Sequence, residues 1–592
     1  MGGDAGMRVA GDAEVDRIAR LATRCRLVLL DMIYRAGSGH AGSSLSCVDI
    51  ISVLKFDQMD WAAGRARSGS DVFVLSKGHA APAWYAALIV DGDLPAADAA
   101  TLRAIDSRLQ GHPDRTRLDL VDVSSGALGQ GLSMALGRAR GKRLKGQGSV
   151  VYCLLGDGEC QEGQVWEAFL YAGAHRVSNV VAIIDHNNTQ SDGTLDDTLP
   201  LRPLPDKLCA FGWHVQEVNG HAHRELREGG PRCRARHGPA VGDHRPHPQG
   251  LARPRPDTAG WQPQRHPVGG GVRPRGRLPG NRPMRSTRDW FGDALAELAS
   301  EYDNLVVVSC DLAQATRTQR FRQEFPDRFF ECGIAEANAI GLAAGLSQEG
   351  YRPFVASFGH FLTGKYLEIF QPIGLNDAGV VLVGTHAGLA IGRDGPTQMG
   401  LRDVALMRTL PNVRVLHPAD GSETGQMVSF LATDRRPGYL RLCRQPQPEV
   451  HGSGYRFRFG VPHVVRDGAE VAVFAMGGTV AVALDAADRL ATGGAPPTVV
   501  NVSSLPADRA MVARILAAHR CAMVVEDHYV TGGLAGDVGR IALSVPDRPR
   551  LDVLAVPDHG QAGPPEDLYA RYRLHAAGIA ARITTFLREH PR

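Results

Sequence analysis

Two apolar runs, each followed by polar residues, decide the fold of this chain. The first is Val150-Val-Tyr-Cys-Leu-Leu155, which leads directly into Gly156-Asp157-Gly158; the second is Val180-Val-Ala-Ile-Ile184, which precedes Asn187-Asn188. Such runs predict buried parallel strands, and ligands bind at the carboxyl ends of these strands. An Asp carboxylate and an Asn amide oxygen are hard ligands that suit Mg²⁺ or Ca²⁺. A lone Gly-Asp-Gly would usually be a turn, but with the Asn pair it predicts a cation that holds a diphosphate at the sheet edge.

The composition is typical of a soluble globular protein. The 592 residues suffice for three or four domains, with 43% apolar and 22% charged residues. No run approaches eighteen uncharged apolar residues, and Met1–Arg20 lacks an apolar stretch, so neither a membrane span nor a signal peptide is expected. The ten cysteines are scattered, and Cys153, Cys310 and Cys443 fall in strand-like runs, which indicates reduced core residues of a cytoplasmic protein.

Strand-like and helix-like stretches alternate over most of the length, which predicts an α/β protein. We expect one domain over residues 1–220, a second over 284–452 and a third over 453–592. The clearest further strand candidates are Leu305–Cys310, Val380–Thr385, Val413–His417, Val471–Ala475, Thr498–Val502 and Ala522–Glu526.

Residues 221–283 differ in kind from the rest. They hold thirteen Arg, eleven Pro, six His and four acidic residues, so the segment carries about +9 while the whole chain carries +3. Such a composition cannot bury enough apolar surface to offset the entropy of ordering. Three interpretations stay open: a stretch translated out of frame from a GC-rich gene, a flexible basic linker, or a nucleic-acid-binding arm. The arm is the least favoured because only Trp261 could stack on a base.

Further motifs follow one another in a fixed order. They are Gly37-Ser-Gly-His40, Ser76-Lys-Gly-His79, Gly111-His-Pro113, Ser125-Gly-Ala-Leu-Gly-Gln-Gly131, Glu331-Cys-Gly-Ile-Ala-Glu336, Ser357-Phe-Gly-His-Phe361, Thr385-His-Ala-Gly388 and Asp394-Gly-Pro-Thr397. Together with Gly156-Asp157-Gly158 and Asn187 this set resembles the transketolase family over about 530 residues. The resemblance implies three doubly wound α/β domains: diphosphate-binding, pyrimidine-binding and C-terminal. The length, with Met284 at the join, resembles a fusion of the two subunits of split transketolases.

The resemblance implies thiamine diphosphate as cofactor, held with Mg²⁺ or Ca²⁺. Glu336 matches the family's acid on N1′ of the aminopyrimidine, which promotes loss of the C2 proton; by position alone it could be a helix N-terminal acid. Phe358 and Phe361 match the aromatic pair on that ring, although their spacing alone favours core packing. Leu128 matches the residue that bends the cofactor.

The remaining cofactor residues that the resemblance implies are Gly126, Gly129, Gly156, Asp157, Gly158 and Glu162. The implied metal ligands are Asp157, Asn187 and the main-chain oxygen of Thr189. Glu162 and Glu167 resemble the acids that couple the two active sites of the family's dimer, or they lie on a surface helix.

The family transfers a two-carbon ketol unit from a ketose phosphate such as xylulose 5-phosphate to an aldose such as ribose 5-phosphate. Its active-site histidines, which move protons on hydroxyl and carbonyl oxygens, match His40, His79, His112 and His386. Asp394 matches the acid that recognises a sugar hydroxyl. Arg288 and Arg444 are candidates for the phosphate clamp, although Arg285 could align in place of Arg288.

Two departures from the family pattern matter. Gln398 stands where the family usually has His after Gly-Pro-Thr; it can hydrogen-bond a sugar but cannot carry charge. The family's first domain also continues with a helix, a strand and a loop bearing a further His, and His237, His244, His247 and His266 lie in no recognisable context. If the segment is genuine, the first domain is expected to be loosely folded there, with weak activity or none.

The alternatives are a deoxyxylulose-phosphate synthase, a transketolase of specialised metabolism, and an inactive homologue. As partners we expect sugar phosphates and a second copy of the chain, with active sites between subunits, and neither nucleic acid nor membrane.

Overall fold

The computed structural model describes residues 3–61, 69–229, 284–491 and 496–591. The chain divides into two units. The first comprises Met1–Arg277 together with the short segment Arg393–Thr397, and the second comprises Leu278–Gly392 with Gln398–Arg592.

The first unit is built on a parallel sheet, whose strands in the described part of the chain are β1 (Val72–Leu75), β2 (Val151–Gly156) and β3 (Val180–Asp185) in that order. The two strands predicted from the apolar runs are therefore confirmed to within one residue. Gly156 pairs with Asp185 in the register, so both strands end at the same edge of the sheet. This pairing brings the polar residues after β2 and β3 together.

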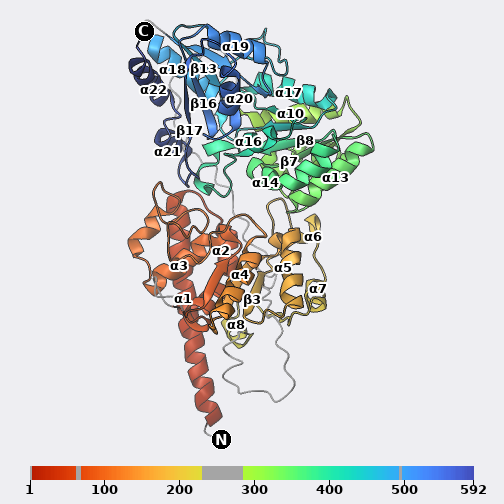
Figure 1. Cartoon of the computed structure of the whole chain (residues 1–592). Helices are drawn as coiled ribbons and strands as arrows, with labels where there is room; N and C mark the ends of the chain where they lie inside the picture. The colour runs from red at the N-terminus through yellow and green to blue at the C-terminus, as the bar shows by residue number, and fades with distance from the viewer. Residues whose placement is uncertain (1–2, 62–68, 230–283, 492–495, 592) are drawn as a thin grey trace. The chain divides into compact units, whose positions relative to one another are not determined.

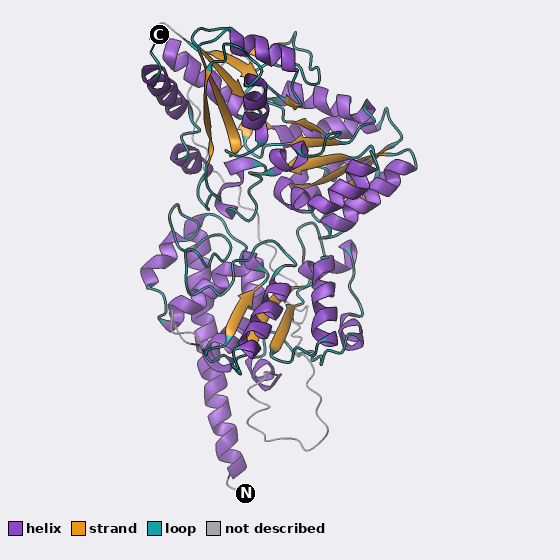
Figure 2. Cartoon of the chain, viewed as in Figure 1, coloured by secondary structure: helices purple, strands orange, loops and turns teal. Residues whose placement is uncertain are grey.

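Alternate residues of these strands pack on opposite faces, as the two-residue period of a strand requires. Phe73, Leu154 and Ile183 face a core formed with α1, α2 and α3, whereas Val74 and Cys153 face a core formed with α4, α5 and α7. Figure 2 shows these strands with helices packed around them. In the described part of this unit the α-helices are α1 (Gly3–Ala36), α2 (Ala41–Val53), α3 (Ala81–Asp91), α4 (Gly131–Leu144), α5 (Gly163–Ala174), α6 (Leu195–Thr198), α7 (Leu204–Ala210) and α8 (His223–Gly229).

The first residues of the basic segment are ordered against this core. Helix α8 packs on α2, and the buried carboxylate of Asp49 lies 2.8 Å from Nδ1 of His221 and 2.8 Å from Nε2 of His223. Arg26 donates to the same carboxylate. The predictions for the rest of the segment, including a missing strand and the roles of its histidines, concern residues 230–283, which lie outside the described residues.

The second unit contains a seven-stranded sheet in the order β15-β9-β10-β8-β7-β5-β6, parallel except for β15. Val307 and Val383 face α10 and α17, whereas Val308 and Leu382 face α13 and α16. Figure 1 shows α10 and α17 on one side of the sheet and α13 on the other. The strands are β5 (Leu305–Ser309), β6 (Phe329–Glu331), β7 (Arg352–Phe358), β8 (Val381–Thr385), β9 (Arg414–Leu416), β10 (Gly438–Arg441) and β15 (Ser504–Leu505); β4 (Arg285–Ser286) pairs separately with β11 (Pro446–Gln447).

A five-stranded sheet, β12-β14-β13-β16-β17, completes the unit, with β12 antiparallel. Its inner residues, such as Phe474 and Val524, belong to the same buried cluster as Val308 and Leu382, so the two sheets share one core. The strands are β12 (His463–Arg466), β13 (Val471–Ala475), β14 (Thr498–Asn501), β16 (Cys521–Tyr529) and β17 (Arg550–Val556). The second unit's α-helices are α10 (Thr287–Ala299), α11 (Ala313–Thr316), α12 (Gln319–Glu324), α13 (Glu336–Gln348), α14 (Gly359–Gly364), α15 (Tyr366–Ile369), α16 (Asp403–Arg408), α17 (Gly421–Thr433), α18 (Thr479–Ala491), α19 (Arg509–Ala517), α20 (Gly533–Ala542), α21 (Pro565–Arg571) and α22 (Ala576–Glu589).

The six strand candidates of this unit are confirmed to within one residue at each end, apart from the end of β16. Strand β16 continues beyond the expected end at Glu526, past a register shift after Val525, and includes Asp527, His528 and Tyr529. No helix in the described ranges is both long and apolar enough to cross a membrane.

Candidate active site

The carboxylate of Asp157 lies at the end of β2 and is held by two backbone donors. The N–H of Gly158 donates to Oδ1 at 2.8 Å, and the N–H of Asn188 donates to Oδ2 at 2.7 Å. Asn188 adopts a left-handed conformation, φ 55°, which turns the chain back toward Asp157 after β3. Burial raises the pKa of Asp157, so a cation beside it would stabilise the ionised form.

The residues at this edge fit a hard divalent cation. Oδ1 of Asn187 accepts from the N–H of Thr189 at 2.9 Å, and the N–H of Asn188 between them donates to Asp157, so this loop is tied to the carboxylate. Oδ1 of Asn188 is a buried acceptor that has no hydrogen-bond partner in the described residues. No group of three His, Cys, Asp or Glu side chains suited to a metal occurs in the described ranges. The expected ligand set of one carboxylate and neutral oxygens favours Mg²⁺ or Ca²⁺ over softer metals.

Two buried side chains that we did not predict organise this edge. Glu159 accepts from the hydroxyl of Ser76 at 2.5 Å and from the N–H groups of Gly129 and Gly156. Lys77 lies 2.5 Å from the buried carboxylate of Asp185. Lys77 lies inside Ser76-Lys-Gly-His79 and Glu159 directly follows Gly156-Asp157-Gly158, so their positions beside these motifs were a usable signal.

The loop expected to bend the cofactor packs tightly on this edge. Gly129, φ 86°, has no room for a side chain because a Cβ would lie 2.9 Å from Cβ of Glu162. Leu128 is half-buried in the same loop, and Glu162 is buried at the start of α5. Glu167 is exposed on α5, so its two interpretations stay open.

Three expected histidines gather in the first unit. The ring of His40 lies 5.4 Å from that of His79 and 6.3 Å from that of His112, measured between centroids. His112 donates from Nδ1 to the main-chain oxygen of Asp394 at 3.0 Å, which leaves Nε2 as the basic nitrogen. The carboxylate of Asp394 accepts from Arg103 at 2.7 Å.

Arg103 is a site residue that the sequence did not reveal. It is 1% exposed, and besides Asp394 it donates to the hydroxyl of Ser38 at 2.8 Å and lies 3.3 Å from Nδ1 of His40. It stands outside every motif quoted above, and only the fold brings it to the histidines.

The surroundings of the three clustered histidines keep their imidazoles neutral at neutral pH. Burial, with His40 and Arg103 as further causes, lowers the pKa of His112 to about 4. Burial lowers the pKa of His79 as well. Desolvation and the neighbouring Arg103 lower the pKa of His40 to about 4. Neutral imidazoles can accept or donate a proton at a sugar hydroxyl.

In the second unit, Glu336 lies buried at the start of α13 and accepts from the hydroxyl of Ser357 at 2.9 Å. Phe358, at the end of the same strand β7, stacks on Phe361 with centroids 5.3 Å apart and an angle of 13°. The ring of His386 lies 4.0 Å from Phe358. The expected pyrimidine residues are thus gathered at the carboxyl ends of β7 and β8.

A short hydrogen-bond chain orients His386. Arg288 donates to Nε2 at 2.8 Å, so the ring proton lies on Nδ1, which contacts the hydroxyl of Thr385 at 2.9 Å; that hydroxyl donates to the main-chain oxygen of Ser357. Burial, then Arg288 and Arg444, lower the pKa of His386 well below its usual range, consistent with a neutral ring.

Of the two arginines considered for the phosphate clamp, Arg288 contacts His386, and its role in the clamp stays a prediction. Arg285 pairs with Asp293 and stacks on Trp290 at 4.8 Å, away from His386. The pKa of Arg288 is lowered to about 10, mainly by burial and to a smaller extent by repulsion from Arg317 and Arg444. Three guanidinium groups near one imidazole make a strongly cationic region. Gln398 is half-buried in this unit, and its role stays a prediction.

Three family models match successive parts of the chain. Residues 18–239 match the family model of the transketolase thiamine diphosphate binding domain, 284–448 that of the transketolase pyrimidine binding domain, and 460–579 that of the transketolase C-terminal domain. The domain boundaries predicted above stay predictions.

Among whole proteins, the chain is 32% identical to transketolase of Rattus norvegicus over 626 aligned residues, which cover 95% of this chain and 96% of the relative. It is 32% identical to transketolase of Homo sapiens over 611 residues, with the same coverage, and 31% identical to transketolase-like protein 2 of Mus musculus, covering 98% and 99%.

Among solved structures, a split-gene transketolase described as an inactive beta4 tetramer is 35% identical, covers 51% of this chain and 98% of its own, and gives a TM-score of 0.47. Transketolase from Campylobacter jejuni is 22% identical, covers 96% and 99%, and gives the same TM-score. The family models and the whole-protein relatives identify the family as well as the fold class. The chain belongs to the transketolase family.

Proposed function

We propose that the chain is a transferase that moves a two-carbon ketol unit from a ketose phosphate, such as xylulose 5-phosphate, to an aldose, such as ribose 5-phosphate. The observation that carries the proposal is the cluster at the ends of β7 and β8, where Glu336, Phe358 and His386 lie beside Arg288. An acid, an aromatic face, a neutral imidazole and a cationic clamp are the parts that this reaction needs from the protein.

Thiamine diphosphate, when bound, supplies the carbon nucleophile and electron sink that allow a bond next to a ketose carbonyl to break. The protein's own groups do the rest. Glu336 would hold a proton at a ring nitrogen of the cofactor, and Phe358 and Phe361 would pack against its aromatic ring. Asp157 and Asn187 would hold the cation and through it a diphosphate. Neutral His386 accepts or donates a proton at a substrate oxygen.

Arg288, Arg317 and Arg444 support the choice of phosphorylated sugars. Their mutual repulsion is relieved by an anion, and guanidinium groups bind phosphate oxygens in a bidentate manner. A sugar phosphate placed there would set its carbonyl end toward His386.

A second copy of the chain is the partner we propose, in a cytoplasmic homodimer. Large apolar side chains are exposed on and after α13 and α15: Leu342 is 39%, Leu367 72% and Leu375 67% exposed. Exposed apolar surface of this kind supports a protein interface. The nine described cysteines are free and all but one are buried, which suits a reducing compartment.

The test is a coupled assay on purified protein with thiamine diphosphate and Mg²⁺, with xylulose 5-phosphate as donor and ribose 5-phosphate as acceptor. We expect release of glyceraldehyde 3-phosphate that depends on both cofactor and acceptor. Consumption of glyceraldehyde 3-phosphate together with pyruvate, with release of CO2, would instead favour a synthase of deoxyxylulose phosphate. Cofactor binding by calorimetry without any release would support another sugar pair, and no binding would support an inactive homologue.

A further inference from the structure

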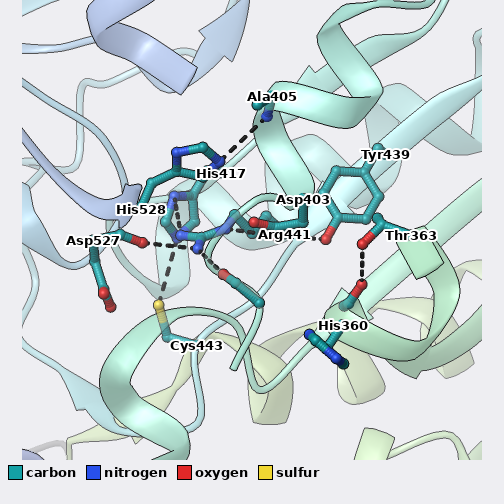
Figure 3. A network of polar contacts seen from close by, with 12 residues as sticks. His360, Thr363, Asp403, Ala405, His417, Tyr439, Arg441, Cys443, Asp527 and His528 are labelled. Atoms are coloured by element: carbon teal, nitrogen blue, oxygen red, sulfur yellow. Dashed lines mark hydrogen bonds and ion pairs between the residues drawn. The ribbon is translucent and has the colours of Figure 1, made fainter. Parts of the chain in front are cut away.

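A network of buried polar side chains joins the two sheets of the second unit. Figure 3 shows Arg441, at the end of β10, between the carboxylate of Asp403 and the main-chain oxygen of Asp527. Arg441 also donates to the main-chain oxygen of Gly400 at 2.7 Å. Arg441 and Asp403 are 2% exposed or less, and Tyr439 donates its hydroxyl to the same Asp403 carboxylate. The main chain at Asp527 is therefore fixed by a fully enclosed cation.

The side chain of Asp527 points to a different target, the turn that follows His386. Both carboxylate oxygens accept from the N–H of Leu389, at 2.9 and 3.2 Å, and Oδ2 also accepts from the hydroxyl of Tyr569 at 2.7 Å. Asp527 is 7% exposed. An ionised carboxylate with these donors makes charge-assisted hydrogen bonds, which are the stronger kind.

The turn is shaped to receive this carboxylate. Gly388 has φ +74°, and a Cβ there would lie 2.0 Å from Oδ2 of Asp527, so only glycine allows the approach. His386 itself is in the left-handed region, φ 56°, a conformation that needs support from its surroundings. Gly388 donates to the main-chain oxygen of Gly400, the group that Arg441 also holds.

We propose that Asp527, on the sheet of the C-terminal domain, is a positioning residue that fixes His386 through the Gly388–Leu389 turn. The sequence assigned no role to Asp527, and the inference rests on the proposed ketol transfer for its catalytic meaning. Asp527 touches neither substrate nor cofactor in this scheme. It sets the backbone on one side of His386, while Arg288 and Thr385 set the ring.

The test compares Asp527→Ala, Asp527→Asn and Asp420→Ala. Asn keeps an oxygen for the Leu389 N–H. Asp420 is a matched control, because it too is buried and accepts backbone N–H groups, from Glu423 and Val450, but has no contact with the turn. Two readouts apply to each variant: hydrogen exchange of the peptide 386–392 by mass spectrometry, and kcat and KM with a ketose phosphate donor.

We expect Asp527→Ala to speed exchange at Leu389 at least ten-fold and to lower kcat/KM about ten- to hundred-fold, because misplacing a reacting group by about 1 Å has effects of this size. Asp527→Asn should recover most of both, and Asp420→Ala should lower the melting temperature without changing kcat/KM more than about three-fold. If Asp527→Ala does not fold, Tyr569→Phe, which removes one partner of the carboxylate, should give smaller changes of the same sign.

Unchanged exchange in Asp527→Ala, a loss in Asp420→Ala as large as that in Asp527→Ala, or no recovery in Asp527→Asn would each overturn the proposal. A wild-type chain without ketol transfer, with exchange still faster in Asp527→Ala, would refute the proposed function while leaving the contact itself supported.

Discussion

Arg103 and Asp394 form an ion pair at 2.7 Å although 291 positions separate them in the sequence. The pair is unequal, since the arginine side chain is 1% exposed and the aspartate 22%. Removing one member leaves the other partly buried and without its counter-charge, which is costly. Asp394, the acid expected to recognise a sugar hydroxyl, therefore depends on Arg103 for its counter-charge. Arg103 lies outside every motif quoted above.

Arg103→Met is therefore expected to lower the free energy of unfolding by about 2 kcal/mol, less than for a fully enclosed pair, and kcat/KM by at least about ten-fold. Adding Asp394→Asn should restore part of the stability, because the unpaired charge is removed. Thermal melts of the two single variants and the double variant measure this coupling. Strictly additive effects would show that the pair does not act as a unit.

Arg444→Gln should raise KM for a phosphorylated donor about ten-fold and leave KM for an unphosphorylated ketose nearly unchanged, because one charge of the cationic region is lost. Arg285→Gln is the control, since Arg285 contacts Asp293 and Trp290 instead. Steady-state kinetics with both donors decide the matter. An equal rise for both donors would argue against a phosphate clamp.

Gln398→His is expected to change acceptor preference more than cofactor affinity. Imidazole can carry a charge that an amide cannot, so acceptors with a phosphate or acidic group should gain most. Rates across a panel of aldoses, with cofactor binding measured by calorimetry, test this. Identical acceptor profiles for both forms would remove Gln398 from the substrate site.

Asp157→Asn should weaken binding of thiamine diphosphate with Mg²⁺ at least ten-fold, because the only carboxylate expected to hold the cation is lost. Ligand bound at a hundred times its Kd stabilises a protein by about 2.7 kcal/mol, so the wild type should melt higher with cofactor and Mg²⁺ than with either alone. Chelation by EDTA should remove the difference. A variant that keeps the full thermal shift would exclude Asp157 as a ligand.

His112 should make stability depend on pH in a predictable direction. Its pKa is about 4 in the folded chain against an ordinary 6.5, so the unfolded chain binds a proton first as pH falls. The contribution of neutral His112 to the free energy of unfolding is fully present above pH 6.5. It is lost as pH falls toward 4, and the loss is on the order of 3 kcal/mol.

In His112→Asn the fall in melting temperature between pH 7.5 and pH 4.5 should therefore be smaller than in the wild type. His175→Asn is the control, because His175 is exposed. An unchanged fall in His112→Asn would show that this imidazole is not held neutral by the fold.

The sequence was most informative where polar site residues follow a predicted strand closely in the chain. Asp157 and Asn187 follow apolar runs directly, so strand prediction alone placed them at one edge. Contacts between distant segments were not predictable in the same way. Arg288 and Arg285 look alike in the sequence, and only packing against Trp290 separates them. Asp527 lies in a strand that we read too short, and its contact with Leu389 spans 138 positions.

The core shared by the two sheets of the second unit has a consequence for how the polypeptide could be divided. A chain break near residue 284 would leave each of the buried apolar clusters intact. A break near residue 453 would cut through one buried cluster and leave Phe474 and Val524 without their partners. The pyrimidine-binding and C-terminal parts should therefore melt as a single calorimetric transition, and a fragment ending at 452 should aggregate when expressed alone.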